Sequence, residues 1–344
     1  MSKITPPTLE QWKRLYELMA QIKELAPGEW MEESDIFGVQ IPKADEVGFV
    51  SVMGMLGEHL AVAVYQGAKG LGGFWEMHSA GHKLTPEFVL QIPQLQASFE
   101  DRELISKEDR EVMKKLGLKY RGAKAWPQFR SYRPGCFPWL IEKDEARMLI
   151  CALEQLLEIA PRFREDPNLF TPTTANHDYL VRVDNNSRWE DSIKHIEFRE
   201  EKTINLLMND EALEHLRTLM PGRLTIEIDL YMLSEPVQEK PKERPFFPFM
   251  LMLADHESGM ILGVDMLTPL PSLEEMWSEV PAIVVEKLAD GLPPKEIHVK
   301  DDMLHLLLQP VAQEVGFNLK KQSRLKQIDY AKRELQKFTN AMHF

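Results

Sequence analysis

The sequence has little cysteine and no long apolar run. Cys136 and Cys151 are the only cysteines among 344 residues, which is too few for a disulfide framework, and their spacing fits no zinc motif. We expect two reduced thiols in a cytoplasmic protein. No stretch approaches the roughly 18 apolar residues of a membrane helix, and no apolar segment resembles a signal peptide. These absences predict a soluble protein without membrane contact.

Positive charge is also scarce. The chain has 41 Lys and Arg residues against 54 Asp and Glu residues, a formal net charge of -13. Such a surface repels nucleic acid and anionic membranes on average, so a polyanion would need a local basic patch. Hydrophobic residues make up 44% of the chain, which is typical of a globular protein with a substantial core. The length predicts two domains.

Hydrophobic periodicity predicts helices and short strands in both halves. Apolar residues recur at helical spacing from Thr8 to Leu25, and Thr8 with Gln11 forms a capping box. Strand-like runs around glycine turns, at Val47 to Tyr65 and at Phe246 to Leu267, predict β-hairpins. We therefore predict an α+β protein with two lobes, each a mainly antiparallel sheet with packed helices.

A proline-rich polar segment divides the two halves. A helical pattern from Asp144 to Ala160 precedes Pro161, and further prolines follow among polar residues up to Asn176. The predicted organisation is an N-terminal α+β domain over residues 1–160, a linker over 161–176 and a C-terminal α+β domain over 177–344.

The two halves share a succession of predicted elements. Hairpin Phe49–Tyr65 corresponds to Phe249–Asp265, and a strand ending at Asp101 corresponds to one ending at Asp301. This pattern indicates a structural duplication of a hairpin, helix, strand, helix and strand. The alternative is coincidence, because this succession is common in mixed domains and the side chains differ.

Aspartates mark strand ends in the second half. Asp229 lies in an apolar strand, Asp255 at a hairpin turn, and Asp301 between a strand and a helix. The order of elements resembles that of ribonuclease-H-like folds, in which carboxylates at such strand ends hold two Mg²⁺ ions for phosphodiester cleavage. The further acidic ligand would be Glu314 or Glu334. The alternative is a non-catalytic fold in which the aspartates cap turns and helices, with no cofactor.

A basic, aromatic segment interrupts the acidic first half. No acidic residue occurs from Lys114 to Arg133, and aromatic residues are interleaved with the cations. Such a mixture can pair phosphates and stack bases, and a second basic run occurs near the C-terminus. The predicted polyanion contacts are Lys119, Arg121, Lys124, Arg130, Arg133, Lys320, Lys321 and Arg324. The alternative is a solvated hairpin whose aromatic residues fill the core.

Two other motifs are incomplete. Glycines from Gly67 to Gly73 lie between a strand and a helix, but they fit neither the dinucleotide fingerprint nor the P-loop, so we expect a turn or helix cap. His78 and His82 have the spacing of a helical metal pair, yet Gly81 interrupts the helix. The sequence therefore predicts neither a zinc site nor a nucleotide enzyme.

Several motifs resemble an uncharacterised bacterial family in which two domains of unknown function follow one another. The first domain is indicated by Glu29-Trp30-Met31, Gly48 to Gly54, Phe99 to Arg102, Arg133-Pro134-Gly135 and Phe137-Pro138-Trp139. The second is indicated by Arg244-Pro245, Asp255, Pro294 and Asp301.

This resemblance implies a bacterial cytoplasmic protein and transfers no catalytic residue. Two hypotheses follow from the sequence. The first is a non-enzymatic binding or regulatory protein whose partner is another protein or a small ligand. The second is a metal-dependent nuclease, or a degenerate ribonuclease-H-like protein, that acts on nucleic acid.

Overall fold

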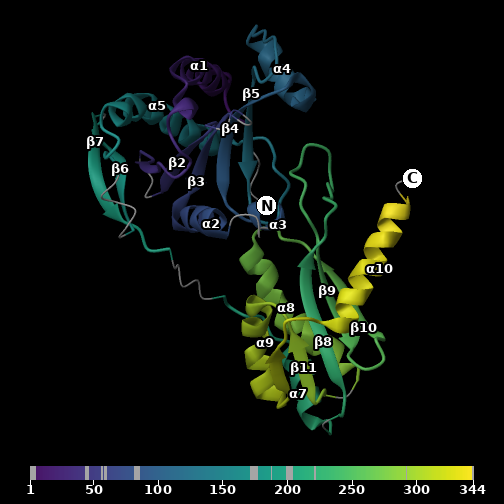
Figure 1. The fold of residues 1–344 in the computed structure, drawn as a ribbon. Helices are drawn as coiled ribbons and strands as arrows, with labels where there is room; N and C mark the ends of the chain where they lie inside the picture. The colour runs from purple at the N-terminus through teal and green to yellow at the C-terminus, as the bar shows by residue number, and fades with distance from the viewer. Residues whose placement is uncertain are drawn as a thin grey trace. The chain divides into compact units, whose positions relative to one another are not determined.

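The computed structural model describes residues 5–42, 46–55, 57, 60–80, 86–170, 177–186, 188–198, 204–220, 222–291 and 293–342. The protein has the predicted α+β class, and the chain divides into two compact units, Met1–Glu201 and Lys202–Phe344. Each unit is built on one mixed sheet (Figure 1). Within the described ranges, no helix combines the length and apolar character that a bilayer crossing requires.

The first unit is a seven-stranded sheet with helices on both faces. Its helices and strands are α1 (Leu9–Leu25), β1 (Phe37–Gln40), β2 (Val47–Met53), β3 (Ala61–Gln66), α2 (Gly67–Ala80), α3 (Pro86–Val89), β4 (Gln94–Glu100), α4 (Lys107–Lys115), β5 (Trp126–Tyr132), α5 (Lys143–Glu165), β6 (Asp178–Asn185) and β7 (Arg188–His195). The strand order is β5-β4-β3-β2-β1-β6-β7. All neighbours are antiparallel except β1 and β6, which run parallel.

Alternate side chains of the strands in this sheet pack into two hydrophobic cores, one on each face of the sheet. Val50 and Val52 of β2 are buried in the core beneath α1 and α5, whereas Phe49 is buried in the core beneath α2. Successive strand residues point to opposite faces. Because both faces of β2 are covered, its side chains are apolar except for Ser51, whose buried hydroxyl donates to the carbonyl oxygen of Glu33 at 2.7 Å.

The predicted domain boundary is wrong. Helix α5 does not end before Pro161 but continues to Glu165, because its apolar face stays buried as far as Phe163. Beyond it, β6 pairs with β1 and belongs to the first sheet. Residues 171–176 of the predicted linker lie outside the described residues. The first unit extends to Glu201.

The second unit is a five-stranded sheet with the order β10-β9-β8-β11-β12. Its helices and strands are α7 (Asp210–Thr218), β8 (Thr225–Met232), β9 (Phe249–Asp255), β10 (Ile261–Leu267), α8 (Leu273–Ala289), β11 (Glu296–Val299), α9 (Asp302–Val315), β12 (Asn318–Lys321) and α10 (Lys326–Met342). Strands β8, β9 and β10 are antiparallel, and β11 runs parallel to both β8 and β12.

The two faces of this second sheet differ. Helices α7, α8 and α9 bury a large core on one face, with Ile228 and Val284 at its centre. On the other face, α10 covers a small cluster around Met252 and Ile328 (Figure 1). We call these the α8 face and the α10 face.

The predicted structural duplication is wrong, because the two sheets have different strand orders. After the hairpin β2–β3, strand β4 joins the sheet beside β3 in antiparallel orientation. The corresponding strand β11 instead crosses to the far side of hairpin β9–β10 and pairs in parallel with β8. The same succession along the chain therefore folds into two topologies.

Candidate functional site

A cleft of about 320 Å³ opens on the first unit beside α1. The helix contributes one wall, and the ends of β4 and β5 with the loop between α4 and β5 contribute the other. The lining residues are Tyr16, Ala20, Lys23, Glu24, Phe99, Tyr120, Ala125 and Pro127. Ala20 presents only a methyl group from α1, so the helix does not fill the space above the strands.

Aromatic rings form the floor of the cleft. The rings of Tyr16 and Tyr120 are stacked, with centroids 6.1 Å apart. The centroid of the Trp126 ring lies 5.9 Å from that of Tyr120. The ammonium group of Lys23 lies 5.3 Å from the centroid of the Phe99 ring, within range of a cation–π interaction. The cleft thus combines π faces with one cation and the nearby carboxylate of Glu24.

Both cleft phenols are neutral at neutral pH, and burial raises the pKa of each further. It raises the pKa of Tyr16 far above the usual range, and the carboxylate of Asp109 adds to the effect. Burial also raises the pKa of Tyr120 to about 12. A protonated phenol can both donate and accept a hydrogen bond, so the cleft can offer both kinds of contact at neutral pH.

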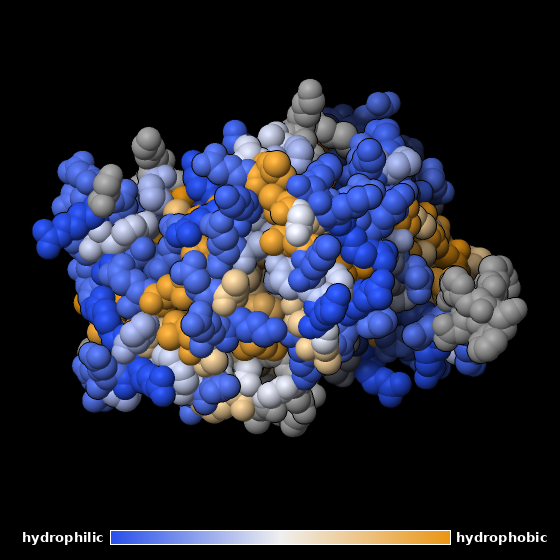
Figure 2. All heavy atoms as spheres, turned by 90° about the horizontal axis from the view of Figure 1, so that it is seen from above, coloured by the Kyte–Doolittle hydropathy of each residue, from blue (hydrophilic) through white to orange (hydrophobic). Residues whose placement is uncertain are grey.

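The surface around α1 and α4, at the top of Figure 1, is mainly hydrophilic. Seen from above, hydrophobic residues come to this surface only in small, separate patches (Figure 2). A cleft floored by aromatic rings is therefore a local feature of a polar surface.

Two of the predicted polyanion contacts are sequence neighbours of a cleft residue. Lys119 and Arg121 are exposed and directly precede and follow Tyr120 in the chain. Lys124 is engaged with the protein itself: its backbone N–H donates to Asp101 Oδ1 at 2.8 Å, and its ammonium group donates to the carbonyl oxygen of Gly57 at 2.8 Å. The cations available to a ligand are thus those nearest Tyr120.

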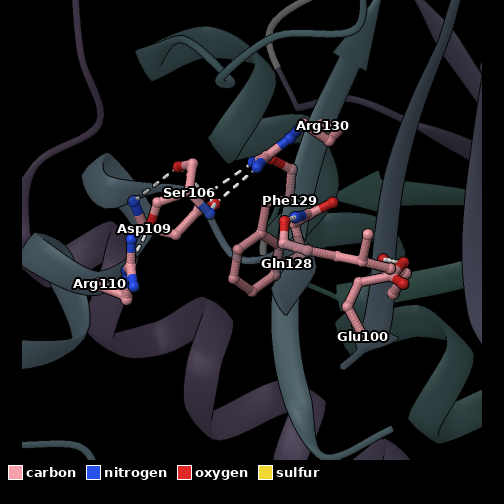
Figure 3. Close-up of polar contacts among 9 residues, drawn as sticks. Glu100, Ser106, Asp109, Arg110, Gln128, Phe129 and Arg130 are labelled. Carbon is pink, nitrogen blue, oxygen red and sulfur yellow. Dashed lines mark hydrogen bonds and ion pairs between the residues drawn. The ribbon is translucent and has the colours of Figure 1, made fainter. Parts of the chain in front are cut away.

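Arg130 has an internal structural role. Its guanidinium group donates to both carboxylate oxygens of Asp109, at 3.0 and 2.6 Å (Figure 3). Asp109 also accepts from the hydroxyl of Ser106 at 2.8 Å and completes the capping box of α4. This buried bidentate pair fixes α4 to β5, so Arg130 is not available to a polyanion.

Arg133 also binds within the protein. Its Nη2 lies 2.7 Å from Oε1 of both Glu142 and Glu145, at the start of α5. In the second unit, Lys320 pairs with Glu296 at 2.6 Å and Lys321 with Asp302. Arg324 is exposed between β12 and α10. Of the eight predicted contacts, Lys119, Arg121 and Arg324 are exposed and stand outside these pairs, whereas Lys320 and Lys321 are exposed but paired with carboxylates.

The three aspartates of the second unit do not converge. Asp229 lies on the α10 face and pairs with Lys332. Asp255 pairs in register with Ile226 and so lies on the α8 face, where it accepts from the hydroxyl of Ser258 at 2.6 Å. This hydrogen bond, together with one from the backbone N–H of Ser258, lowers the pKa of Asp255.

Asp301 accepts from the N–H of Leu304 at 3.0 Å and is the N-cap of α9. The candidate further ligands pair elsewhere, Glu314 with Arg217 and Glu334 with Lys337. In the part of the chain that the structure describes, no three His, Cys, Asp or Glu residues are placed to hold a metal ion.

The sequence interpretation missed a buried carboxylate beneath α10. Glu227 of β8 is 0% exposed and accepts from the N–H groups of Gln327 and Ile328, at 2.8 and 3.0 Å, and it contacts His256 Nδ1 at 2.6 Å. A helix N-terminus favours a negative charge. The sequence did contain a signal, because Glu227 lies two residues before Asp229 and therefore on the same face of the strand. The structure shows that this carboxylate anchors helix α10.

The contact between His256 and His298 connects this anchor to a second group of charged residues, centred on Glu296. The rings of His256 and His298 are 5.1 Å apart and nearly perpendicular. His298 Nε2 lies 2.5 Å from Glu296 Oε1, and Glu296 also holds Lys320. The lysine first and then the histidine lower the pKa of Glu296. The network joins four neighbouring strands on the α10 face.

The comparison with known protein families follows the division of the structure. Residues 12–182 match a family model described as Domain of unknown function (DUF7309), and residues 212–336 match one described as Domain of unknown function (DUF6930). Two consecutive domains of unknown function thus cover most of the chain. One match falls in each compact unit, which confirms the predicted resemblance to two consecutive domains. No curated protein matches the chain.

The glycine run of the DUF7309 domain belongs to α2 and is not a separate turn or cap. A Cβ atom at Gly70 would lie 2.7 Å from the carbonyl oxygen of Pro93, so glycine lets the helix approach the strands closely. His82 lies outside the described residues. Cys136 and Cys151 are both thiols, and burial raises the pKa of Cys151 to about 11.

Proposed function

We propose that the protein is a non-enzymatic binding protein of the bacterial cytoplasm, and that its DUF7309 domain binds a small planar ligand in the cleft beside α1. The observation that carries this proposal is a cleft of about 320 Å³ floored by Tyr16, Phe99 and Tyr120. Small-molecule sites are concave, largely apolar and supplied with a few polar groups, which describes this cleft.

The charges around the cleft support a ligand with an aromatic ring and an anionic group. A ring can stack on Tyr120, while the ammonium group of Lys23 and the exposed Lys119 and Arg121 can meet a phosphate. A charge acts mainly within about 8 Å at physiological salt, so these cations can outweigh the acidic surface locally. A mononucleotide is the ligand class that combines these features.

Calorimetric titration with purine and pyrimidine mononucleotides, and with the matching nucleosides, tests the proposal. We expect micromolar to millimolar binding of at least one nucleotide, weaker binding of its nucleoside, and at least a tenfold loss in Tyr120→Ala. The double variant Lys119→Ser/Arg121→Ser should reduce the salt dependence of binding. Lys114→Ser/Lys115→Ser removes two exposed cations of the same segment and is the matched control. Absence of binding at low salt, or unchanged affinity in Tyr120→Ala, would contradict the proposal.

We further propose that the DUF6930 domain is a degenerate, non-catalytic relative of ribonuclease-H-like proteins. The succession of strand, hairpin, helix, strand, helix and strand predicted from the sequence occurs in β8 to β12. Asp229 and Asp255, however, lie on opposite faces, and both are engaged with other side chains. We expect no cleavage of DNA or RNA with Mg²⁺ or Mn²⁺. Cleavage that disappears in Asp229→Asn would refute this assignment.

A further inference from the structure

Tyr16 brings a buried phenol to the cleft beside α1. The residue is 4% exposed, and the centroids of the Trp12, Tyr120 and Phe129 rings lie 6.5, 6.1 and 5.2 Å from that of its own ring. With the residues that the structure describes, its hydroxyl forms no hydrogen bond. Because three rings hold the side chain, the position of this unpartnered hydroxyl is fixed before a ligand binds.

The hydroxyl is not sealed inside the core. Among the described residues, the buried side-chain oxygens without a hydrogen bond are Asp184 Oδ1 and Asp265 Oδ2. The Tyr16 oxygen is not one of them, so it still reaches open space, and the space that Tyr16 lines is the cleft. Burying a hydroxyl costs free energy unless it is hydrogen-bonded. A ligand with a polar atom at this point would therefore gain a specific contact.

The surroundings of this hydroxyl suit a neutral polar group better than a phosphate. Burial first, and then the carboxylate of Asp109, raise the pKa of Tyr16, an effect that Arg130 partly offsets. A phosphate here would be buried beside a negative charge, which is costly. The ammonium group of Lys23, by contrast, is exposed in the same cleft and can meet a phosphate in water. The two ends of a nucleotide thus have different places.

We propose that Tyr16 is a specificity-determining residue of the cleft, whose hydroxyl forms a hydrogen bond with the polar edge of a base while the phosphate stays at the exposed cations. This inference rests on the proposed function, because it concerns the same cleft and the same ligand class. A phenol both donates and accepts, so it can pair with a carbonyl oxygen, a ring nitrogen or an amino group. A site with such a group discriminates against an analogue that lacks the partner atom.

Calorimetric titration of Tyr16→Phe tests the assignment. The probes are the monophosphates of adenosine, guanosine, cytidine and uridine, and the four nucleosides. The substitution removes one oxygen and keeps the ring. For the nucleotide that the wild type prefers, we expect affinity to fall about threefold to tenfold. The same factor should apply to its nucleoside, and at low and physiological salt alike, because the lost hydrogen bond involves the base and no charge.

Two controls separate recognition from folding. Tyr65→Phe removes the hydroxyl of another buried phenol, 3% exposed in the core beneath α2, and should bind like the wild type. Tyr16→Phe should not lower the free energy of unfolding in urea, because the hydroxyl has no hydrogen bond within the protein.

The possible failures are distinct. If the wild type binds a nucleotide and Tyr16→Phe binds it equally well, the role of Tyr16 is refuted and the proposed function stands. A loss confined to nucleotides, or one that shrinks at higher salt, would place the phosphate at Tyr16 and overturn the orientation. A wild-type protein that binds neither nucleotides nor nucleosides would overturn both proposals.

Discussion

The two sheets of the molecule differ in how their faces are covered. In the DUF7309 domain, α1 with α5 and α2 bury large apolar clusters on opposite faces of the sheet. In the DUF6930 domain, one face carries a large cluster, whereas among the described residues the cluster beneath α10 has four buried hydrophobic residues, Met252, Ala254, Leu325 and Ile328. The central strands of the first sheet are covered on both faces, whereas one face of the second sheet is covered by the single helix α10.

Each of the two sheets also contains a buried charged side chain, and the two have different roles. Arg182 of the first sheet is buried, and its guanidinium group donates to Gln155 at 2.9 Å, to Asp191 at 2.5 Å and to Glu158. It thereby joins β6 to α5 and β7. Glu227 of the second sheet instead holds the first turn of a helix. In both domains the buried charge is paired with its neighbours. Arg182 fixes a strand that completes the first sheet, and Glu227 fixes the helix that covers one face of the second.

Cutting the chain tests the comparison most severely. We expect fragment 1–201 to unfold cooperatively, and fragment 202–344 to do so as well, because each retains its whole sheet. Fragment 1–160 lacks β6 and β7 and leaves the apolar residues of β1 at an open edge, so it should show no cooperative transition. Urea titrations followed by circular dichroism measure this. A cooperative transition in fragment 1–160 would show that β6 and β7 are dispensable.

Matched core truncations compare the covered and partly covered faces. Phe49→Ala removes a ring buried beneath α2 and should lower the free energy of unfolding of the DUF7309 domain by about 3–5 kcal/mol. Met252→Ala, beneath α10, should cost about 2 kcal/mol, because neighbouring side chains near an uncovered strand can relax. Urea unfolding of the two fragments gives both values. An equal or larger cost for Met252→Ala would remove the distinction between the faces.

Removing the anchor beneath α10 should loosen one helix without unfolding the sheet. Glu227→Ala leaves two N–H groups of α10 without their acceptor, at a cost of about 2–3 kcal/mol. Glu227→Gln keeps one acceptor oxygen and should cost less. Hydrogen exchange should accelerate at Gln327 and Ile328 and stay unchanged in α8. The exposed residue Glu239 offers the control Glu239→Ala, which should behave as wild type.

The ion pairs of Glu296 should produce a small dependence of stability on pH. Because the folded protein lowers the pKa of this carboxyl below its unfolded value of about 4.3, its stabilisation is complete above that value. The stabilisation is lost as the pH falls through the lowered folded-state pKa. Glu296→Gln should therefore cost about 1 kcal/mol at pH 7 and almost nothing near pH 2. A cost that does not change with pH would assign the effect to packing.

Local features were predictable from the sequence. The capping box of Thr8 and Gln11 and the N-cap Asp301 involve residues three positions apart, and both occur as expected. The turn around Gly259, which has φ of +74°, likewise joins β9 to β10. Such elements depend on neighbouring residues, so a single sequence contains their signal.

Features that depend on distant contacts were not predictable. Pro161 signals a helix end, yet packing of the apolar face of α5 overrides that preference. Nothing in β6 itself indicates that β1 is its neighbour. The sequence interpretation counted Arg130 among the cations that could bind a ligand. Its ion pair with Asp109 is not visible in the sequence, because Asp109 lies on a different element of the fold. The cleft also escaped prediction, since its walls come from three separate segments.

The parallel pairing of β1 with β6 has a consequence for the order in which the chain folds during synthesis. Phe37–Gln40 leaves the ribosome long before Asp178–Asn185, and at about 5–20 residues per second the interval is on the order of 10 s. Throughout that time β1, which β2 can already pair on one side, is an open edge on its other side, and Phe37 and Val39, both buried in the finished protein, lie on that edge strand. The nascent DUF7309 domain is therefore most exposed to misassociation while β6 is still being made, and binding by a chaperone in this interval would protect it.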